Sequence, residues 1–105
     1  MVALWRDLHA AGADVALVGH RHTYARYALR DADGLPARTG IRQFVVGTGG
    51  KNHGESSVTQ PETVEVRDDE TFGVLELTLR PASYGWRFVP EAGGTFRDAG
   101  STSCR

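Results

Sequence analysis

The stretch Asp14-Val15-Ala16-Leu17-Val18-Gly19-His20-Arg21-His22 decides the fold prediction, because it joins an apolar run directly to two histidines. Four consecutive apolar residues after Asp14 predict a strand that is covered on both faces, in the interior of a sheet. Residues two apart on a strand point the same way and lie about 6.6 Å apart. We therefore expect His20 and His22 to face one site.

Two imidazoles that face one site predict metal binding. The ions of two-metal hydrolytic centres lie about 3.5 to 4 Å apart, and a ring nitrogen binds zinc at about 2.0 to 2.1 Å. His20 and His22 could thus bind one ion each, and Gly19 lets the chain leave the strand without a side chain that obstructs the site. A His-x-His pair also arises by chance, so the spacing alone leaves a structural explanation open.

Local patterns around this stretch predict one helix followed by strands. Leu4, Trp5 and Leu8 have helical spacing, which predicts a helix over residues 2–11 that ends at Gly12. The remaining predictions are a strand at 14–18, an extended segment at 23–29, a surface turn at 31–36, a strand at 41–46 and a polar loop at 51–70.

A β-hairpin follows the polar loop. Leucines alternate with other residues in one segment, and aromatic residues alternate in the next, which is the period of a strand. The two faces consist of Leu75, Leu77 and Leu79, and of Tyr84, Trp86 and Phe88, with a turn at residues 81–83. We expect these faces to form core, the alternative being a platform on which a ligand stacks. The chain is thus predicted to be α/β, with one amino-terminal helix and a β-rich, mostly antiparallel remainder.

Several different motifs follow one another in a fixed order along nearly the whole chain. Gly19-His20-Arg21-His22 leads into Thr23-Tyr24-Ala25-Arg26, then comes Gly47-Thr48-Gly49-Gly50, and Gly94-Thr95-Phe96 closes the hairpin. This succession resembles the carboxy-terminal portion of the calcineurin-like metallophosphoesterases, in the purple acid phosphatase branch. Ala25 stands where that family usually has glutamate, and Arg21 stands where an acidic residue is frequent.

The resemblance implies a division of the chain and a parent fold, the αββα sandwich. Residues 1–105 would be the carboxy-terminal segment of one metallophosphoesterase domain. Residues 1–30 would hold its last metal-binding block, 41–50 a strand and glycine-rich turn, 51–70 a loop, and 71–98 the hairpin region. The upstream part of the same domain would then be a partner of this segment.

The resemblance also implies a dinuclear centre that hydrolyses phosphate esters. His20 would bind the second of two divalent or trivalent ions, Fe, Zn or Mn, and His22 the first. The family's Asp-x-His, Gly-Asp-x-x-Asp and Gly-Asn-His blocks are missing, so the site is incomplete and we expect the chain alone to be inactive. Asp7-Leu8-His9 is not a substitute, because residues two apart on a helix diverge by about 200°. Asn52-His53-Gly54-Glu55 is not one either, because it follows the histidine block instead of preceding it.

Further residues are assigned by their place near the histidines. Tyr24 is expected to pack against the sheet. Arg26 could hold a carboxylate or a substrate phosphate oxygen, because its fork matches both. His53 follows the glycine-rich turn in the same relative place as in many members of the phosphatase branch, so the resemblance implies that it could contact substrate. Gly47, Gly49 and Gly50 form a turn whose amides could meet an anion. The competing function is a noncatalytic β-rich interaction module that retains a relic metal block.

Composition excludes some partners. Twelve basic residues against thirteen acidic ones give a net charge of −1, with no basic cluster, so no nucleic-acid partner is expected. No apolar run reaches the 18 or so residues that cross a bilayer, so no membrane partner is expected either. Cys104, the single cysteine, has no disulfide partner in the chain. It would pair with an upstream cysteine in a secreted parent or remain a free thiol, which leaves the location open.

Overall fold

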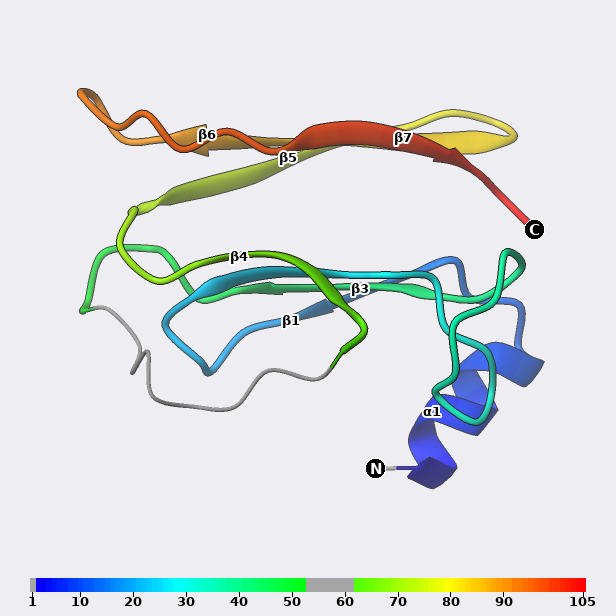
Figure 1. Cartoon of the computed structure of the whole chain (residues 1–105). Coiled ribbons are helices and arrows are strands. Elements are labelled where there is room, and N and C mark those ends of the chain that lie inside the picture. The colour runs from blue at the N-terminus through cyan, green and yellow to red at the C-terminus, as the bar shows by residue number, and fades with distance from the viewer. Residues whose placement is uncertain (1, 53–61) are drawn as a thin grey trace.

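The computed structural model describes residues 2–52 and 62–105, which form one helix and two β-sheets (Figure 1). The elements are α1 (Val2–Ala10), β1 (Val15–Val18), β2 (Tyr24–Tyr27), β3 (Arg42–Val46), β4 (Val64–Asp68), β5 (Gly73–Leu79), β6 (Ser83–Pro90) and β7 (Ala99–Ser103). The prediction of a small mixed α/β domain, rich in strands, is confirmed. None of the described residues belongs to a helix with the length and apolarity that crossing a bilayer requires.

The two sheets lie face to face, with α1 at one end below the larger sheet (Figure 1). The larger sheet has the strand order β1-β3-β2-β4, and the smaller has the order β5-β6-β7. β1 pairs with β3 in parallel, whereas the other pairings among the described strands are antiparallel. The mostly antiparallel character predicted from the sequence is therefore confirmed.

Aromatic side chains fill the space between the sheets. The buried cluster consists of Tyr24, Phe44, Tyr84, Trp86 and Phe88. The ring centroids of Tyr24 and Phe88 lie 4.9 Å apart, and those of Phe44 and Trp86 lie 5.5 Å apart in an edge-on arrangement. These are the spacings at which aromatic pairs attract beyond simple burial. The aromatic face of the hairpin is thus core, as its period-two pattern predicts.

Helix α1 ends as the sequence predicts. Gly12 has a φ of +84°, the left-handed conformation that glycine adopts without steric cost. The Gly12 amide donates to the His9 carbonyl at 3.1 Å, and the Ala13 amide donates to the Leu8 carbonyl at 3.1 Å. This pair of bonds is the Schellman motif, which satisfies the last carbonyls of a helix.

Strand β1 contradicts the prediction that it lies in a sheet interior. It is an edge strand, because β3 is its one partner among the described residues. Leu17 is 58% exposed and Val18 is 42% exposed, so their apolar side chains are not covered on both faces as expected. The apolar run correctly predicts a strand, but no described residues bury the side chains of Leu17 and Val18.

Two further predictions about strands are wrong, and one strand was not predicted. The polar loop expected over residues 51–70 contains β4, which pairs with β2 and packs Val66 against the core. β7 was not predicted, because glycine and serine favour turns. Gly100 is suited to it, since a Cβ there would collide with the Trp86 ring. Leu79, at the end of β5, is 75% exposed instead of buried.

Candidate metal site

Two loops meet at one edge of the larger sheet. β1 and β3 run in parallel, so their carboxyl ends, Val18 and Val46, lie at the same edge. The loop 19–23 follows β1, and the glycine-rich segment 47–52 follows β3. In open sheets with parallel strands, ligand sites form beyond the carboxyl ends of the strands. The topology therefore places the predicted histidines where such a site would lie.

The backbone of the histidine loop is bent, not extended. The Arg21 amide donates to the Gly19 carbonyl, and the Thr23 amide donates to the Arg21 carbonyl, both at 2.9 Å. His20 has a φ of +73°, which is uncommon for a residue with a side chain. The geometric argument that His20 and His22 face one way along a strand is therefore wrong, since β1 ends at Val18. Both histidines instead project from a tight turn, with His20 exposed and His22 half-buried.

Gly47 allows the two loops to approach closely. A Cβ at this position would collide with the carbonyl oxygen of Arg21, and the Gly47 amide donates to the Thr23 carbonyl at 3.0 Å. A Cβ at Gly19 or Gly49, in contrast, would meet nothing within 4 Å. Packing therefore requires glycine at position 47 and leaves the other two positions free.

The side chain of Asn52 orients His22. The Oδ1 atom of Asn52 lies within hydrogen-bond distance of Nδ1 of His22. An amide oxygen only accepts, so this contact suits the tautomer with its proton on Nδ1, in which the lone pair is on Nε2. Metal-ligating histidines are held in this way by a carbonyl or carboxylate on the other nitrogen. Sequence reasoning missed Asn52 in this role, although its place just after the glycine-rich turn was a usable signal.

Two threonines fasten the loops to the strands behind them. The hydroxyl of Thr23 lies 3.0 Å from the Asp68 carbonyl oxygen, at the end of β4, and also contacts the Asp69 carboxylate. The hydroxyl of Thr48 donates to the Gly73 carbonyl at 2.8 Å, at the start of β5. Each loop is thus tied to a strand that the histidines do not belong to.

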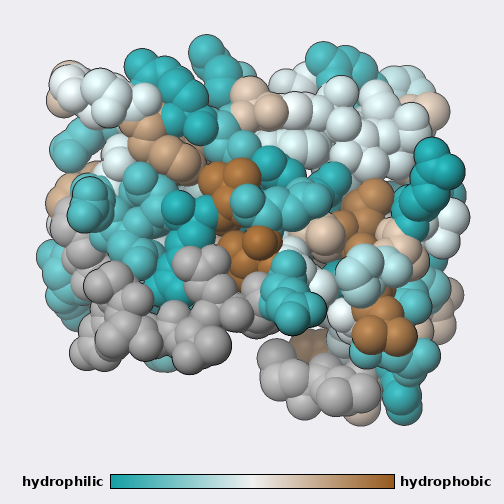
Figure 2. Space-filling view, in the orientation of Figure 1, coloured by the Kyte–Doolittle hydropathy of each residue, from teal (hydrophilic) through white to brown (hydrophobic). Residues whose placement is uncertain are grey.

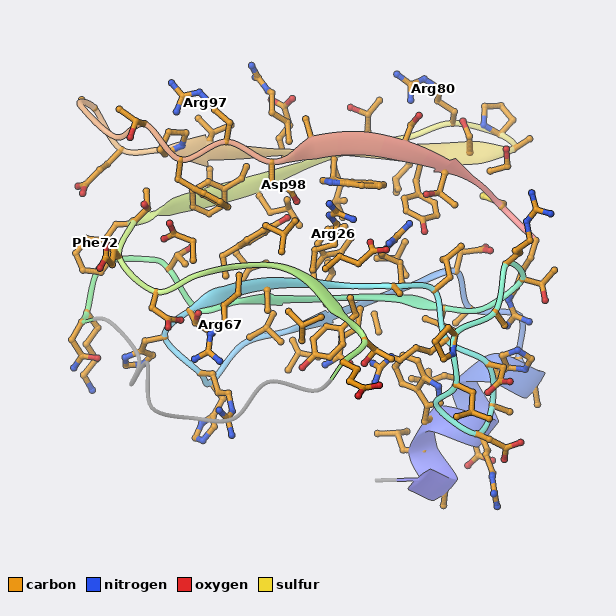
Figure 3. All side chains as sticks on the ribbon, viewed as in Figure 1. Arg26, Arg67, Phe72, Arg80, Arg97 and Asp98 are labelled. Carbon is orange, nitrogen blue, oxygen red and sulfur yellow. The ribbon has the colours of Figure 1, made fainter. Side chains whose placement is uncertain are left out.

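Arg26 does not lie at the histidine loop. It points between the sheets toward Asp98, as Figure 3 shows, with Nε 2.9 Å from one carboxylate oxygen and Nη2 3.1 Å from the other. Its Nη1 also contacts Glu65 at 2.5 Å, and its guanidinium carbon lies 5.2 Å from the centre of the Trp86 ring. Of the two partners that the sequence allowed for Arg26, the structure shows a carboxylate.

Tyr24 completes this inner cluster. Its hydroxyl donates to Asp98 at 2.5 Å, and its side chain is fully buried, which confirms the prediction that it packs in the fold. Burial raises the pKa of Tyr24 far above its usual value, and the neighbouring Asp98 carboxylate raises it further. Burial by itself would lower the pKa of Arg26, but the hydrogen bonds and charge of Asp98 outweigh it, so the pKa is raised.

The remaining candidate residues are not gathered around the histidines. No group of three or more His, Cys, Asp or Glu side chains suited to a metal ion occurs within residues 2–52 and 62–105. Asp7 and His9 lie on α1, as the helical reading of that segment requires. His53, the proposed substrate contact, lies outside the described residues.

The described donor set thus consists of two imidazoles on one tight turn, one of them in contact with the side chain of Asn52. Such a pair fills half of a tetrahedral site. Additional ligands must come from elsewhere for a complete centre to form. No protein-family model, curated protein or solved structure matches the chain.

Proposed function

We propose that the chain is the carboxy-terminal part of a dinuclear, metal-dependent phosphoesterase of the acid phosphatase type, to which His20 and His22 contribute metal ligands. The observation that carries this proposal is the contact between Nδ1 of His22 and Oδ1 of Asn52. It leaves Nε2 of His22 as the free donor, on a loop at the carboxyl ends of two parallel strands.

The packing of the loop supports the same proposal. The Gly47 amide holds the turn just after His22 by donating to the Thr23 carbonyl, and His20 has a left-handed conformation that costs free energy. Bound metal ions would supply a hydroxide nucleophile and neutralise charge on the phosphoryl oxygens. The part of this chain is to hold two imidazoles at fixed positions before any ion arrives.

The open edge of β1 supports the view that further polypeptide completes the site. β1 leads straight into the histidine loop, and its outer edge has no strand partner among the described residues. Parallel sheets are normally covered on both faces, yet Leu17 is 58% exposed here. A neighbouring strand placed along this edge would pair with the backbone groups of β1 and end close to the histidines.

A proton-detected nitrogen spectrum of the imidazoles, recorded while Zn²⁺ is added to the full chain, tests the proposal. Before Zn²⁺ is added, His22 should show the tautomer protonated at Nδ1. On addition, the Nε2 signal of His22 and one ring signal of His20 should move together, while the signals of His9 stay fixed. His9 serves as the internal control, because it lies on α1.

Asn52→Leu provides the matched variant. It removes the acceptor at Nδ1 without touching the histidine loop, so the Nδ1 tautomer of His22 should lose its preference and Zn²⁺ should bind about 10-fold or more weakly. Zn²⁺ shifts confined to His9, or unchanged binding in His20→Ala and His22→Ala, would contradict the metal site and favour the noncatalytic interaction module. Hydrolysis of p-nitrophenyl phosphate by this chain with metal alone would contradict the incomplete-site interpretation.

A further inference from the structure

A pocket of about 340 Å³ opens between α1 and the face of the larger sheet that points away from the core. Its apolar wall has two sides. Leu4 and Leu8 line it from the helix, one turn apart, and Ala16 and Val18 line it from β1, two residues apart. Figure 2 shows apolar surface exposed over α1, where Leu4 is 52% exposed. A pocket of this size and lining is of the kind that holds small organic molecules.

Arg30 supplies the charge of this pocket. Its guanidinium is stacked between two aromatic rings, 4.4 Å from the centre of Trp5 and 4.5 Å from the centre of Tyr27. Its Nη2 donates to the side-chain oxygen of Gln43, which also lines the pocket. The stacking and the hydrogen bond fix the plane of the guanidinium at the pocket wall.

No carboxylate neutralises Arg30 within the described part of the chain. Its Nε is buried without a hydrogen-bond partner there, and burial lowers its pKa by more than the neighbouring Tyr27 raises it. Asp33 lines the same pocket, but its carboxylate pairs with Arg6 at 3.0 Å. The pocket thus combines an apolar wall with one unpaired, oriented cation.

We propose that this pocket binds a small monocarboxylic acid with an apolar body, whose carboxylate pairs with Arg30 while its hydrocarbon lies against Leu4, Leu8 and Val18. A guanidinium fork matches a carboxylate with two parallel hydrogen bonds. The volume admits one or two fused rings or a short alkyl chain. The inference does not depend on the metal site, because the residues that line this pocket do not include the histidine loop, residues 19–23.

Titration calorimetry with 2-naphthoate and with the neutral 2-naphthalenemethanol tests this proposal on the full chain. The two probes share an apolar body and differ in charge. The acid should bind at least about tenfold more tightly than the alcohol. Arg30→Met should erase that difference, whereas Arg38→Met, at an exposed arginine of the neighbouring loop, should preserve it.

Ala16→Phe provides an independent variant, because it fills the pocket from β1 and leaves Arg30 untouched. It should abolish binding of both probes, with circular dichroism as the check that the fold persists. Equal affinities for acid and alcohol in the unmodified chain would overturn the proposal. Unchanged binding of 2-naphthoate in a folded Ala16→Phe variant would also overturn it. The Ala16→Phe measurement therefore tests the proposal even if Arg30→Met does not fold.

Discussion

The space between the two sheets and the open side of β1 both carry apolar side chains, but these are buried in the first region and exposed in the second. Between the sheets, aromatic side chains of β2, β3 and β6 bury one another, and the charges of Arg26 and Asp98 satisfy each other. Along β1, Leu17 and Val18 face solvent, and the histidines at its end have no third ligand among the described residues. The described residues thus form a closed core between the sheets, whereas the edge of β1 and the histidine loop remain open to solvent.

Two residues paired across the strands test this comparison most strongly. Leu17 on β1 lies opposite Phe44 on β3, and both point to the same face of the sheet. Phe44 is fully buried, so Phe44→Ala should lower the free energy of unfolding by about 3 to 5 kcal/mol. Leu17→Ala should lower it by less than about 1 kcal/mol, because that side chain already meets water.

Urea denaturation of both variants, compared by midpoint at unchanged slope, gives the two values. Similar losses for Leu17→Ala and Phe44→Ala would show that the edge of β1 is covered in solution, for example by a second molecule. A dependence of the Leu17→Ala loss on protein concentration would identify that case.

Removal of an inner charge should have the next largest effect. Asp98→Ala leaves Arg26 and the hydroxyl of Tyr24 without their shared partner in a buried layer, and should cost about 3 kcal/mol. Asp33→Ala is the matched control, because its pair with Arg6 is exposed, with 64% and 59% of the side chains accessible. Such surface pairs contribute about 1 kcal/mol or less. Thermal unfolding followed by circular dichroism would compare the two, and equal losses would contradict the closed interior.

Substitutions in the glycine-rich turn test the open region. Gly47→Ala should cost about 1 to 3 kcal/mol, because the added methyl group collides with the Arg21 carbonyl. Gly49→Ala should be nearly neutral, since a methyl group there meets nothing within 4 Å. Gly47→Ala should also shift the amide signals of the histidine loop in a nitrogen–proton spectrum. Equal behaviour of the two variants would mean that the two loops do not pack as described.

High pH tests the hydroxyl of Tyr24. In the unfolded chain a tyrosine loses its proton near pH 10, whereas burial keeps folded Tyr24 protonated above that value. Above pH 10 the unfolded state therefore binds fewer protons, and the free energy of unfolding falls by up to about 1.4 kcal/mol per pH unit. Tyr24→Phe removes this contribution. Denaturation at pH 10 and pH 11 should show a smaller drop for the variant, and an equal drop would contradict the buried hydroxyl.

The sequence predicted those parts of the fold whose signal is local. Gly12 predicts the helix end because the cap depends on the φ of that residue. Tyr84, Trp86 and Phe88 predict core because their alternation along one strand places them on the same face. β4 and β7 depend on distant partners. β7 pairs with β6 across a sheet in which Gly100 makes room for Trp86, and no short-range pattern contains that fact.

The candidate site divides in the same way. The glycine and histidines after β1 stand out in the sequence, but the bend at His20 and the contact from Asn52 to His22 depend on how two loops pack. The sequence allowed either a carboxylate or a phosphate as the partner of Arg26. The carboxylate that binds it belongs to Asp98, more than seventy positions later in the chain. Contacts of this range require the strand order, which the sequence alone did not provide.

The order of the two layers along the chain has a consequence for synthesis. The larger sheet, which contains Tyr24 and Phe44, is complete once β4 has been translated, at Asp68, whereas the smaller sheet that covers it ends with β7 at Ser103, roughly 35 residues later. At elongation rates of about 5 to 20 residues per second, the uncovered sheet would wait about 2 to 7 s for its second layer. During that interval a nascent chain would present an aromatic surface of the kind that chaperones recognise.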